Sequence, residues 1–164
     1  MIRYATYESP LGTVIAIAND EGIWSIDFVD AKYARRIGGD WVEDRDHPPL
    51  RECFRQLAEY FAGKRREFDL PLAPRGTSFQ ERVWKEIARV PYGETISYGE
   101  LAKRAGAPGQ ARAAGAATGR NPVGVVIPCH RIVGSDGSLT GYAGGLHRKQ
   151  SLLELEGVLQ RSLI

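Results

Sequence analysis

The stretch Pro128-Cys129-His130-Arg131-Ile132 places a soft nucleophile beside a base. Cysteine attacks as its thiolate, so a reactive cysteine needs a neighbouring base or positive charge, which His130 or Arg131 could supply. Neighbouring side chains on a strand point to opposite faces, so His130 could reach Cys129 only through a turn or a bridging water. A third group must orient the imidazole, and the adjacent sequence does not identify it. The residues predict nucleophilic catalysis by Cys129, with a buried structural cysteine as the alternative.

The segments on either side of this motif should position the cysteine. Residues 123–127 are mostly apolar and follow Asn121-Pro122, which predicts a buried strand that ends just before Cys129. Downstream, residues 134–137 predict a turn, and the small residues of 141–145 predict a loop beside the cysteine. Loops of this kind often form the walls of a pocket.

The length of 164 residues, with 43% hydrophobic and 26% charged residues, predicts a soluble globular protein. No stretch approaches the roughly 18 apolar residues of a membrane helix, and residues 1–4 do not begin a signal peptide. The two cysteines, Cys53 and Cys129, lie in different halves, which favours a reducing compartment over a disulfide framework. We expect a cytoplasmic protein that does not bind membranes.

Charge is distributed unevenly along the chain. Residues 1–78 carry 11 basic and 13 acidic residues, whereas residues 79–164 carry 11 basic and 7 acidic residues. Between residues 103 and 149 the acid Asp136 stands among seven basic residues, namely Lys103, Arg104, Arg112, Arg120, Arg131, Arg148 and Lys149. This cluster around the cysteine predicts a polyanionic partner, with a solvated basic surface as the alternative.

The first half of the chain predicts a small α/β domain over residues 1–76. Three short strands of an antiparallel meander are expected at residues 2–7, 13–18 and 23–29. Residues 30–47 predict little regular structure. Residues 48–62 carry apolar side chains at helical spacing, and Cys53 lies on that stripe, so we assign it to the core. Residues 71–76 contain two prolines and a glycine and predict a linker.

The second half, residues 77–164, predicts a helical domain. Ser78 with Glu81, and Ser97 with Glu100, have the capping-box spacing of helix N-termini. The expected helices cover residues 79–90, 98–105, 110–118 and 147–156. The second and third of these are joined by a short glycine turn, which is the helix-turn-helix pattern.

The expected helix 110–118 consists almost entirely of small residues around Arg112. It offers almost no side chain that could read base edges, which disfavours a sequence-specific repressor. Small residues allow close backbone approach, and Arg112 remains as one long cationic probe, which suits a shape-based contact with the DNA minor groove. A core helix packed through its alanines is the alternative.

Glu156 is the last residue of the final expected helix, which Gly157 caps. The helix macrodipole disfavours a carboxylate at that end. An acid at this position therefore suggests another role, such as orienting a histidine.

The stretch around Cys129 resembles the active-site signature of the O6-alkylguanine-DNA alkyltransferases, which directly reverse guanine alkylation. The similarity runs roughly from Phe79 to Gly157, and the N-terminal half resembles the family only through its opening strands and Tyr60-Phe61-Ala62-Gly63. The matching motifs are Val83-Trp84, Pro91-Tyr92-Gly93-Glu94, Ile96-Ser97-Tyr98, Ala111-Arg112-Ala113, Asn121-Pro122 and Leu152-Leu153-Glu154-Leu155-Glu156-Gly157.

The resemblance implies an α/β (α+β) fold in two parts. The N-terminal part would be a ribonuclease H-like domain with a three-stranded antiparallel sheet and a helix. The C-terminal part would be a winged-helix-like helix-turn-helix domain that carries the active site. The implied function is DNA repair by direct reversal: the alkyl group of O6-alkylguanine, or of O4-alkylthymine, moves irreversibly to Cys129 after nucleotide flipping. Each molecule would act once, because a thioether has no water-labile bond.

The resemblance also implies roles in the reaction. Cys129 would accept the alkyl group, His130 would act as the base through a water, and Glu156 would orient His130. Asn121 would brace the turn that bears the nucleophile. Tyr98 would donate a proton to guanine N3 as the base leaves.

Two further sets of residues follow from the family's motifs. The substrate-binding set comprises Val133, Tyr142, Ala143, Gly144 and Lys149. The DNA-binding set comprises Ala111, Arg112, Ala113, Gly115, Thr118, Arg120 and Arg131. Within it, Arg112 would fill the gap left by the flipped nucleotide. The expected partner is double-stranded DNA containing O6-alkylguanine, contacted in the minor groove without strong sequence specificity by a monomer, with cooperative binding left open.

Two features separate this chain from some relatives. Certain members bind zinc in the N-terminal half, but His47, His130 and His147 lie far apart here, so we expect no metal and no cofactor. Members without transfer activity carry tryptophan in place of the cysteine, whereas this chain keeps Cys129.

Two alternatives remain: a non-catalytic DNA-binding module or regulator that recognises alkylated bases, and a cysteine hydrolase, which would need an oxyanion hole.

Overall fold

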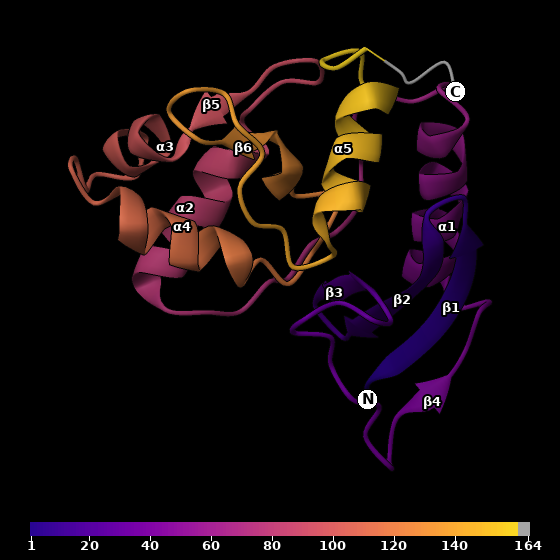
Figure 1. Ribbon diagram of the computed structural model, residues 1–164. Helices are drawn as coiled ribbons and strands as arrows, with labels where there is room; N and C mark the ends of the chain where they lie inside the picture. Colours follow the sequence, from indigo (N-terminus) through magenta and orange to yellow (C-terminus); the bar gives the residue numbers. More distant parts are fainter. Residues whose placement is uncertain (161–164) are drawn as a thin grey trace.

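The structure, a computed structural model, describes residues 1–160 and combines a sheet with a group of helices (Figure 1). The N-terminal sheet with its one helix lies at one end, and most helices of the C-terminal half gather at the other. This arrangement confirms the predicted mixed α/β class with a helical C-terminal part. Residues 161–164, the end of the second predicted domain, lie outside the described range.

The N-terminal half contains a four-stranded sheet in the order β3-β2-β1-β4. Strands β1 (Arg3–Ser9), β2 (Gly12–Asn19) and β3 (Gly22–Phe28) form the predicted antiparallel meander. A fourth strand, β4 (Val42–Glu43), pairs in parallel with β1. The prediction of three strands missed it, because two residues are too few to leave a periodic pattern in the sequence.

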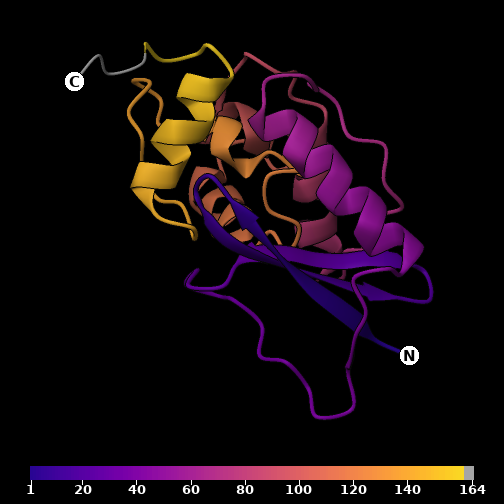
Figure 2. The same cartoon turned by 90° about the vertical axis from the view of Figure 1, so that its right-hand side faces the viewer.

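Helix α1 (Pro48–Phe61) packs on the first three strands (Figure 2). Its buried stripe consists of Leu50, Cys53, Phe54, Gln56, Leu57 and Tyr60. Cys53 is completely buried, and burial raises the pKa of its thiol to about 12. This confirms the assignment of Cys53 to the core.

The C-terminal half contains the four predicted helices and a short parallel strand pair. The elements are α2 (Ser78–Ala88), β5 (Ile96–Ser97), α3 (Tyr98–Arg104), α4 (Ala111–Gly119), β6 (Ile132–Val133) and α5 (Leu146–Leu155). Ser97 caps α3 as predicted. The capping box of α2 is instead formed by Thr77 and Gln80, one residue before the predicted pair, because the Thr77 side chain accepts from the Gln80 N–H. No helix among residues 1–160 is long and apolar enough to cross a membrane.

Helices α2, α3 and α4 pack together as the predicted helix-turn-helix unit. Gly106 and Gly109 both have φ of +81°, a conformation that glycine adopts without strain, so the turn depends on them. Ala114 and Ala117 of α4 are buried against the unit. The indole of Trp84 on α2 donates to the Ala117 carbonyl at 2.8 Å, which fixes α4 against α2.

The two halves share one hydrophobic core. Ile23 on β3 forms a bridge to Leu72 in the predicted linker, and Ile26 on β3 forms a bridge to Val123 near the active-site segment. The proposed boundary between residues 76 and 77 stays a prediction. What the structure adds is that β3 lies directly against the segment that leads to Cys129.

Candidate active site

Cys129 lies on a tight turn and not at the end of a strand. Val125, four residues earlier, has φ of +67°, which an extended strand cannot adopt. Cys129–Arg131 then form a single 3₁₀ turn. The predicted buried strand at residues 123–127 is therefore wrong, because a short apolar run fits a buried turn as well as a strand.

The Asn121 side chain holds this turn from within. Its Oδ1 accepts from the Val123 N–H at 3.0 Å, and its Nδ2 donates to the Ile127 carbonyl at 2.8 Å. The backbone N–H of Cys129 donates to the same carbonyl at 2.8 Å. Asn121 is thus placed where it can brace the turn that bears the nucleophile.

A buried hydrogen-bonded group lies next to Cys129 in the chain. His130 Nε2 is 2.7 Å from Oε2 of Glu156. Arg131 donates through Nε to Oε1 at 2.8 Å and through Nη2 to Oε2 at 3.0 Å. The Tyr60 hydroxyl donates to Oε2 at 2.5 Å. The Glu156 carboxylate therefore binds three side chains at once.

These bonds determine the charge of Glu156. Burial alone would raise its pKa, but hydrogen bonds from His130, Arg131 and Tyr60 outweigh burial and hold the pKa of Glu156 at about 2. An ionised carboxylate can only accept hydrogen bonds, so Nε2 of His130 carries the proton of the neutral ring. This tautomer, assigned from the hydrogen-bond network, leaves a lone pair on Nδ1.

His130 has the properties of a general base. Burial lowers the pKa of His130, although Glu156 acts in the opposite direction, so the ring is neutral near pH 7. Its Nδ1 is buried and bonds no protein atom among residues 1–160. Buried polar atoms without a protein partner are rare in native structures and often mark function.

The Cys129 thiol is protonated at rest. Burial raises the pKa of the thiol to about 11, although the Asn121 side chain and the Lys149 charge act to lower it. Freely reactive cysteines have lowered pKa values, so this thiol needs a base at the moment of reaction. His130 is a candidate for that base, because it lies in the same turn.

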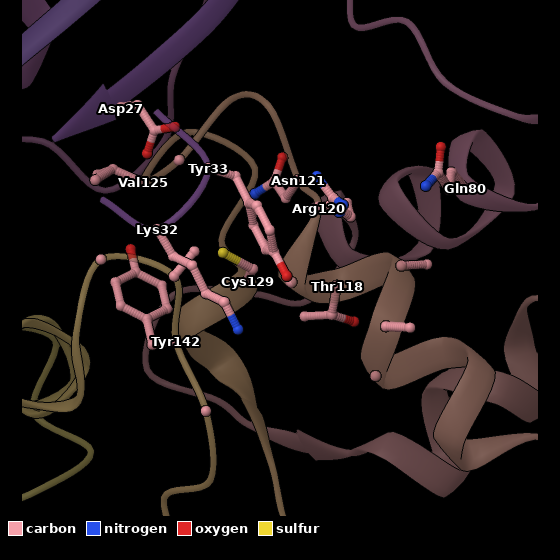
Figure 3. Close-up of a pocket in the computed structure, with 18 of the residues that line it drawn as sticks. Asp27, Lys32, Tyr33, Gln80, Thr118, Arg120, Asn121, Val125, Cys129 and Tyr142 are labelled. Atoms are coloured by element: carbon pink, nitrogen blue, oxygen red, sulfur yellow. The ribbon is translucent and has the colours of Figure 1, made fainter. Parts of the chain in front are cut away.

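The side chain of Cys129 faces a cavity of about 810 Å³ that both halves of the molecule line (Figure 3). The loop 141–144, Tyr98 and much of α4 form one side. The N-terminal half contributes Asp27, Phe28, Lys32 and Tyr33. The volume lies within the range of small-molecule sites. Among residues 1–160, no cluster of histidine, cysteine and acidic side chains is arranged to bind a metal.

Comparison with known proteins assigns the family. Residues 78–158 match the family described as "6-O-methylguanine DNA methyltransferase, DNA binding domain". Residues 2–74 match "6-O-methylguanine DNA methyltransferase, ribonuclease-like domain". The chain belongs to the 6-O-methylguanine DNA methyltransferase family.

Similar proteins cover nearly the whole chain. A methylated-DNA–protein-cysteine methyltransferase of Methanosarcina acetivorans is 46% identical over 154 residues, 94% of this chain and 97% of that protein. One of Mycolicibacterium paratuberculosis is 47% identical over 156 residues, 95% and 93% of the two chains. A crystal structure of Mycobacterium tuberculosis OGT in complex with DNA has a TM-score of 0.86 at 44% identity, covering 94% of this chain and 92% of that one. The predicted family and its two-part fold are confirmed.

In this family member, three of the five predicted substrate-binding residues line the cavity: Tyr142, Ala143 and Gly144. Val133 and Lys149 are buried and are not among the residues that line it. The Lys149 ammonium donates to three backbone carbonyls, those of Ile132, Thr140 and Gly141, at 2.6, 3.1 and 3.2 Å. Lys149 therefore anchors the loop that forms the wall, which corrects its predicted contact with the substrate.

Tyr98 lies at the cavity with a protonated hydroxyl. It lines the cavity, and its hydroxyl donates to the Thr140 carbonyl at 2.9 Å. Burial raises the pKa of Tyr98, so the hydroxyl keeps its proton at neutral pH. The residue can therefore donate that proton to a ligand.

Helix α4 has an exposed face and a buried face. Its small residues are therefore compatible both with a close contact to DNA and with packing in the core. Ala111, Arg112 and Ala113 are exposed, as a DNA contact requires, and Gly115 is half-buried. Thr118 is buried, and its hydroxyl donates to the Ala114 carbonyl at 2.7 Å. Thr118 also lines the cavity, and its predicted DNA contact stays a prediction.

The basic cluster is smaller at the surface than the sequence indicated. Arg131 is only 6% exposed, and its third nitrogen, Nη1, donates to the Val90 carbonyl at 2.7 Å, while the others bind Glu156. This contradicts the predicted DNA contact of Arg131, since its charge is neutralised inside. Arg148 and Lys149 are also buried.

Sequence reasoning missed the contribution of the N-terminal half to the cavity. Asp27 lines it, and burial raises the pKa of Asp27 to about 7. The Lys32 N–H donates to the Ala143 carbonyl at 2.9 Å. Tyr33 lies against the exposed guanidinium of Arg120, 3.8 Å from the ring centre. The sequence signal for this contribution was Asp27, an acid between two apolar residues of a predicted strand. That pattern is too common to indicate a site.

Proposed function

We propose that this protein repairs DNA by transferring the alkyl group of O6-alkylguanine irreversibly to the sulfur of Cys129. One observation carries the proposal: Cys129 faces a cavity from a braced turn, next to a buried His130–Glu156 pair with an unpaired Nδ1. The relatives named methylated-DNA–protein-cysteine methyltransferases support the same reaction.

The chemistry begins with removal of the thiol proton. His130 Nδ1 takes this proton from Cys129 through a water molecule, and the Glu156 carboxylate stabilises the imidazolium that forms. The thiolate then attacks the saturated carbon of the alkyl group. The S–C bond forms while the C–O6 bond breaks, and the electron pair stays on the guanine.

The leaving group needs a proton because an anionic guanine leaves poorly. The Tyr98 hydroxyl donates this proton to guanine N3, so that the base leaves neutral. Tyr98 regains a proton from solvent, and the imidazolium of His130 returns one to solvent. The thioether on Cys129 cannot be hydrolysed, so each molecule acts once.

The damaged nucleotide must leave the base stack before Cys129 can reach it. Arg112 on the exposed face of α4 fills the gap in the duplex, and Ala111 and Ala113 allow the helix to approach the minor groove closely. The DNA complex of the similar Mycobacterium tuberculosis protein supports DNA as the partner. We place the protein in the cytoplasm as a monomer, in keeping with its two free cysteines.

The test is to digest repaired DNA to nucleosides. The protein is mixed with excess duplex DNA containing one O6-methylguanine, and O6-methyldeoxyguanosine should be converted to deoxyguanosine in an amount equal to the protein added. Cys129→Ser should abolish this conversion, and Cys53→Ala should retain it. Release of a free base, or more than one conversion per molecule, would contradict the proposal, and binding without conversion would support the non-catalytic DNA-binding module instead.

A further inference from the structure

Tyr60, near the end of α1, connects the N-terminal half directly to the buried pair beside Cys129. Its side chain is completely buried, and its hydroxyl donates to Oε2 of Glu156 at 2.5 Å. The same oxygen is 2.7 Å from Nε2 of His130. This bond joins the last turn of α1 to the residue that follows α5, 96 positions away in the chain.

Aromatic neighbours fix the position of this hydroxyl. The ring centre of Tyr60 lies 5.4 Å from that of Phe61, 5.4 Å from that of Phe68 and 6.3 Å from that of Tyr92. A phenylalanine would fill nearly the same space in such a cluster. The hydroxyl is therefore held in place before substrate arrives, as a positioning group must be.

The charged and titratable groups around Glu156 give this hydroxyl a distinct role. Arg131 bonds both carboxylate oxygens, and the charge of Lys149 acts on His130 from α5. The side chains of Tyr60 and Tyr92 pack against each other beside Glu156. Burial raises the pKa of Tyr60, so its hydroxyl stays protonated. Tyr60 thus donates to Oε2 without adding a charge.

We propose that Tyr60 is a positioning residue for alkyl transfer, holding Oε2 of Glu156 so that His130 keeps its proton on Nε2 and leaves Nδ1 free to take the thiol proton. The inference rests on the proposed function of Cys129. It gives the ribonuclease-like half a direct part in chemistry performed by the other half.

Tyr60→Phe removes only the hydroxyl. Oε2 then loses one donor, and its negative charge acts more strongly on His130, which raises the pKa of that imidazole. Since neutral His130 is the base, the acid limb of the pH–rate profile should shift to higher pH. The rate of Cys129 alkylation by free O6-benzylguanine should fall several-fold on the acid limb and return to the wild-type rate at higher pH, where the imidazole of both proteins is neutral.

Tyr92→Phe is the matched control. Its hydroxyl donates to the Leu155 carbonyl at 3.2 Å, next to Glu156 in the chain but not to its carboxylate. Both variants lose one hydroxyl from the same aromatic cluster, so both should lose some thermal stability. The Tyr92→Phe variant should keep the wild-type pH–rate profile.

Proton NMR of the wild-type protein gives a measurement that needs no variant to fold. The Tyr60 hydroxyl proton should exchange slowly and show a nuclear Overhauser effect to the Nε2 proton of His130. Absence of that contact in the folded protein would overturn the inference.

The outcomes separate the two proposals. If wild-type protein does not transfer the benzyl group to Cys129, the proposed function fails. If wild-type protein reacts and Tyr60→Phe has the same acid limb, whatever its rate or stability, the hydroxyl is structural and the inference alone fails. A shifted acid limb in Tyr60→Phe, with none in Tyr92→Phe, supports it.

Discussion

At the scale of residues, the site pairs a thiol of raised pKa with a base of lowered pKa. Burial produces both effects, because it disfavours the thiolate of Cys129 and the imidazolium of His130. The resting thiol is a poor nucleophile, and poor nucleophiles are also poor targets for oxidants. In the proposed reaction, the charge of Glu156 stabilises the imidazolium when it forms.

Glu156→Gln tests this stabilisation. The amide keeps the size of the side chain but removes the charge that faces His130, so the imidazolium loses its stabilisation. The rate of Cys129 alkylation by O6-benzylguanine at neutral pH should fall by at least about tenfold, while DNA affinity changes little.

Glu154→Gln, on the same helix, is the control. The Glu154 carboxylate accepts a bond from the Gln150 amide at the surface, and this variant should react at the wild-type rate. A Glu156→Gln protein that reacts normally and is only less stable would show that Glu156 has a structural role.

The sequence identified the residues whose signals are local. Cys129 and His130 stand in one motif, and Glu156 stands where a helix end disfavours an acid. Tyr60 could not be assigned, because its partner lies 96 residues away and a tyrosine on an apolar stripe reads as core. Arg131 was assigned to DNA because its charge suggests the surface, and only tertiary contacts reveal its buried partners.

At the scale of elements, α4 packs through one face and exposes Arg112 on another. Its inner alanines pack against α2 and α3, and its outer face carries Arg112 away from the buried pair of His130 and Glu156. A residue that acts only on the duplex should therefore be dispensable when the substrate is a free base.

Arg112→Ala should slow repair of O6-methylguanine in duplex DNA by about tenfold or more, because the flipped state loses the side chain that fills its gap. Reaction with free O6-benzylguanine should be unchanged. Both rates are measured by single-turnover kinetics on the same preparation.

Arg104→Ala controls for the loss of one surface charge. Arg104 is an exposed residue of α3 that pairs with Glu100, and its removal should affect duplex repair much less than removal of Arg112. Equal losses on duplex and free base in Arg112→Ala would rule out a role in the extrahelical gap.

The bounds of the elements were predicted well in both halves of the chain, for the fourteen-residue α1 and the seven-residue α3 alike. Helices α1 and α5 and the first three strands lie within two residues of their expected bounds. The five residues 123–127 were too few to distinguish a strand from a turn, and the side-chain bonds of Asn121 favour the turn. The start of α2 was one residue off, since Thr77 and Ser78 both precede a suitable partner.

At the scale of the whole molecule, Arg148 joins the two halves around the cavity. Its Nε donates to the Leu11 carbonyl at 2.9 Å, and its Nη1 donates to the Gly144 carbonyl at 3.1 Å and to Asp30 at 2.6 Å. The guanidinium also lies 4.1 Å from the ring centre of Phe28. The loop that forms the cavity wall is thereby fixed to the N-terminal sheet.

Arg148→Ala should lower the free energy of unfolding by about 2 kcal/mol, because it leaves buried carbonyls without a donor. Asp30→Asn should cost much less, since Asp30 is largely exposed and such ion pairs contribute little. Urea unfolding of the three proteins measures both differences. Equal losses in the two variants would mean that the ion pair, and not the carbonyl bonds, joins the halves.

In the proposed reaction, Cys129 accepts one alkyl group and then reacts no further. Intact mass spectrometry followed by peptide mapping measures this after the protein is mixed with excess duplex DNA containing one O6-methylguanine. The mass of every active molecule should rise by about 14 Da, one methylene equivalent, and the added mass should map to Cys129. An unchanged mass with continued repair, or a label on Cys53, would contradict the account.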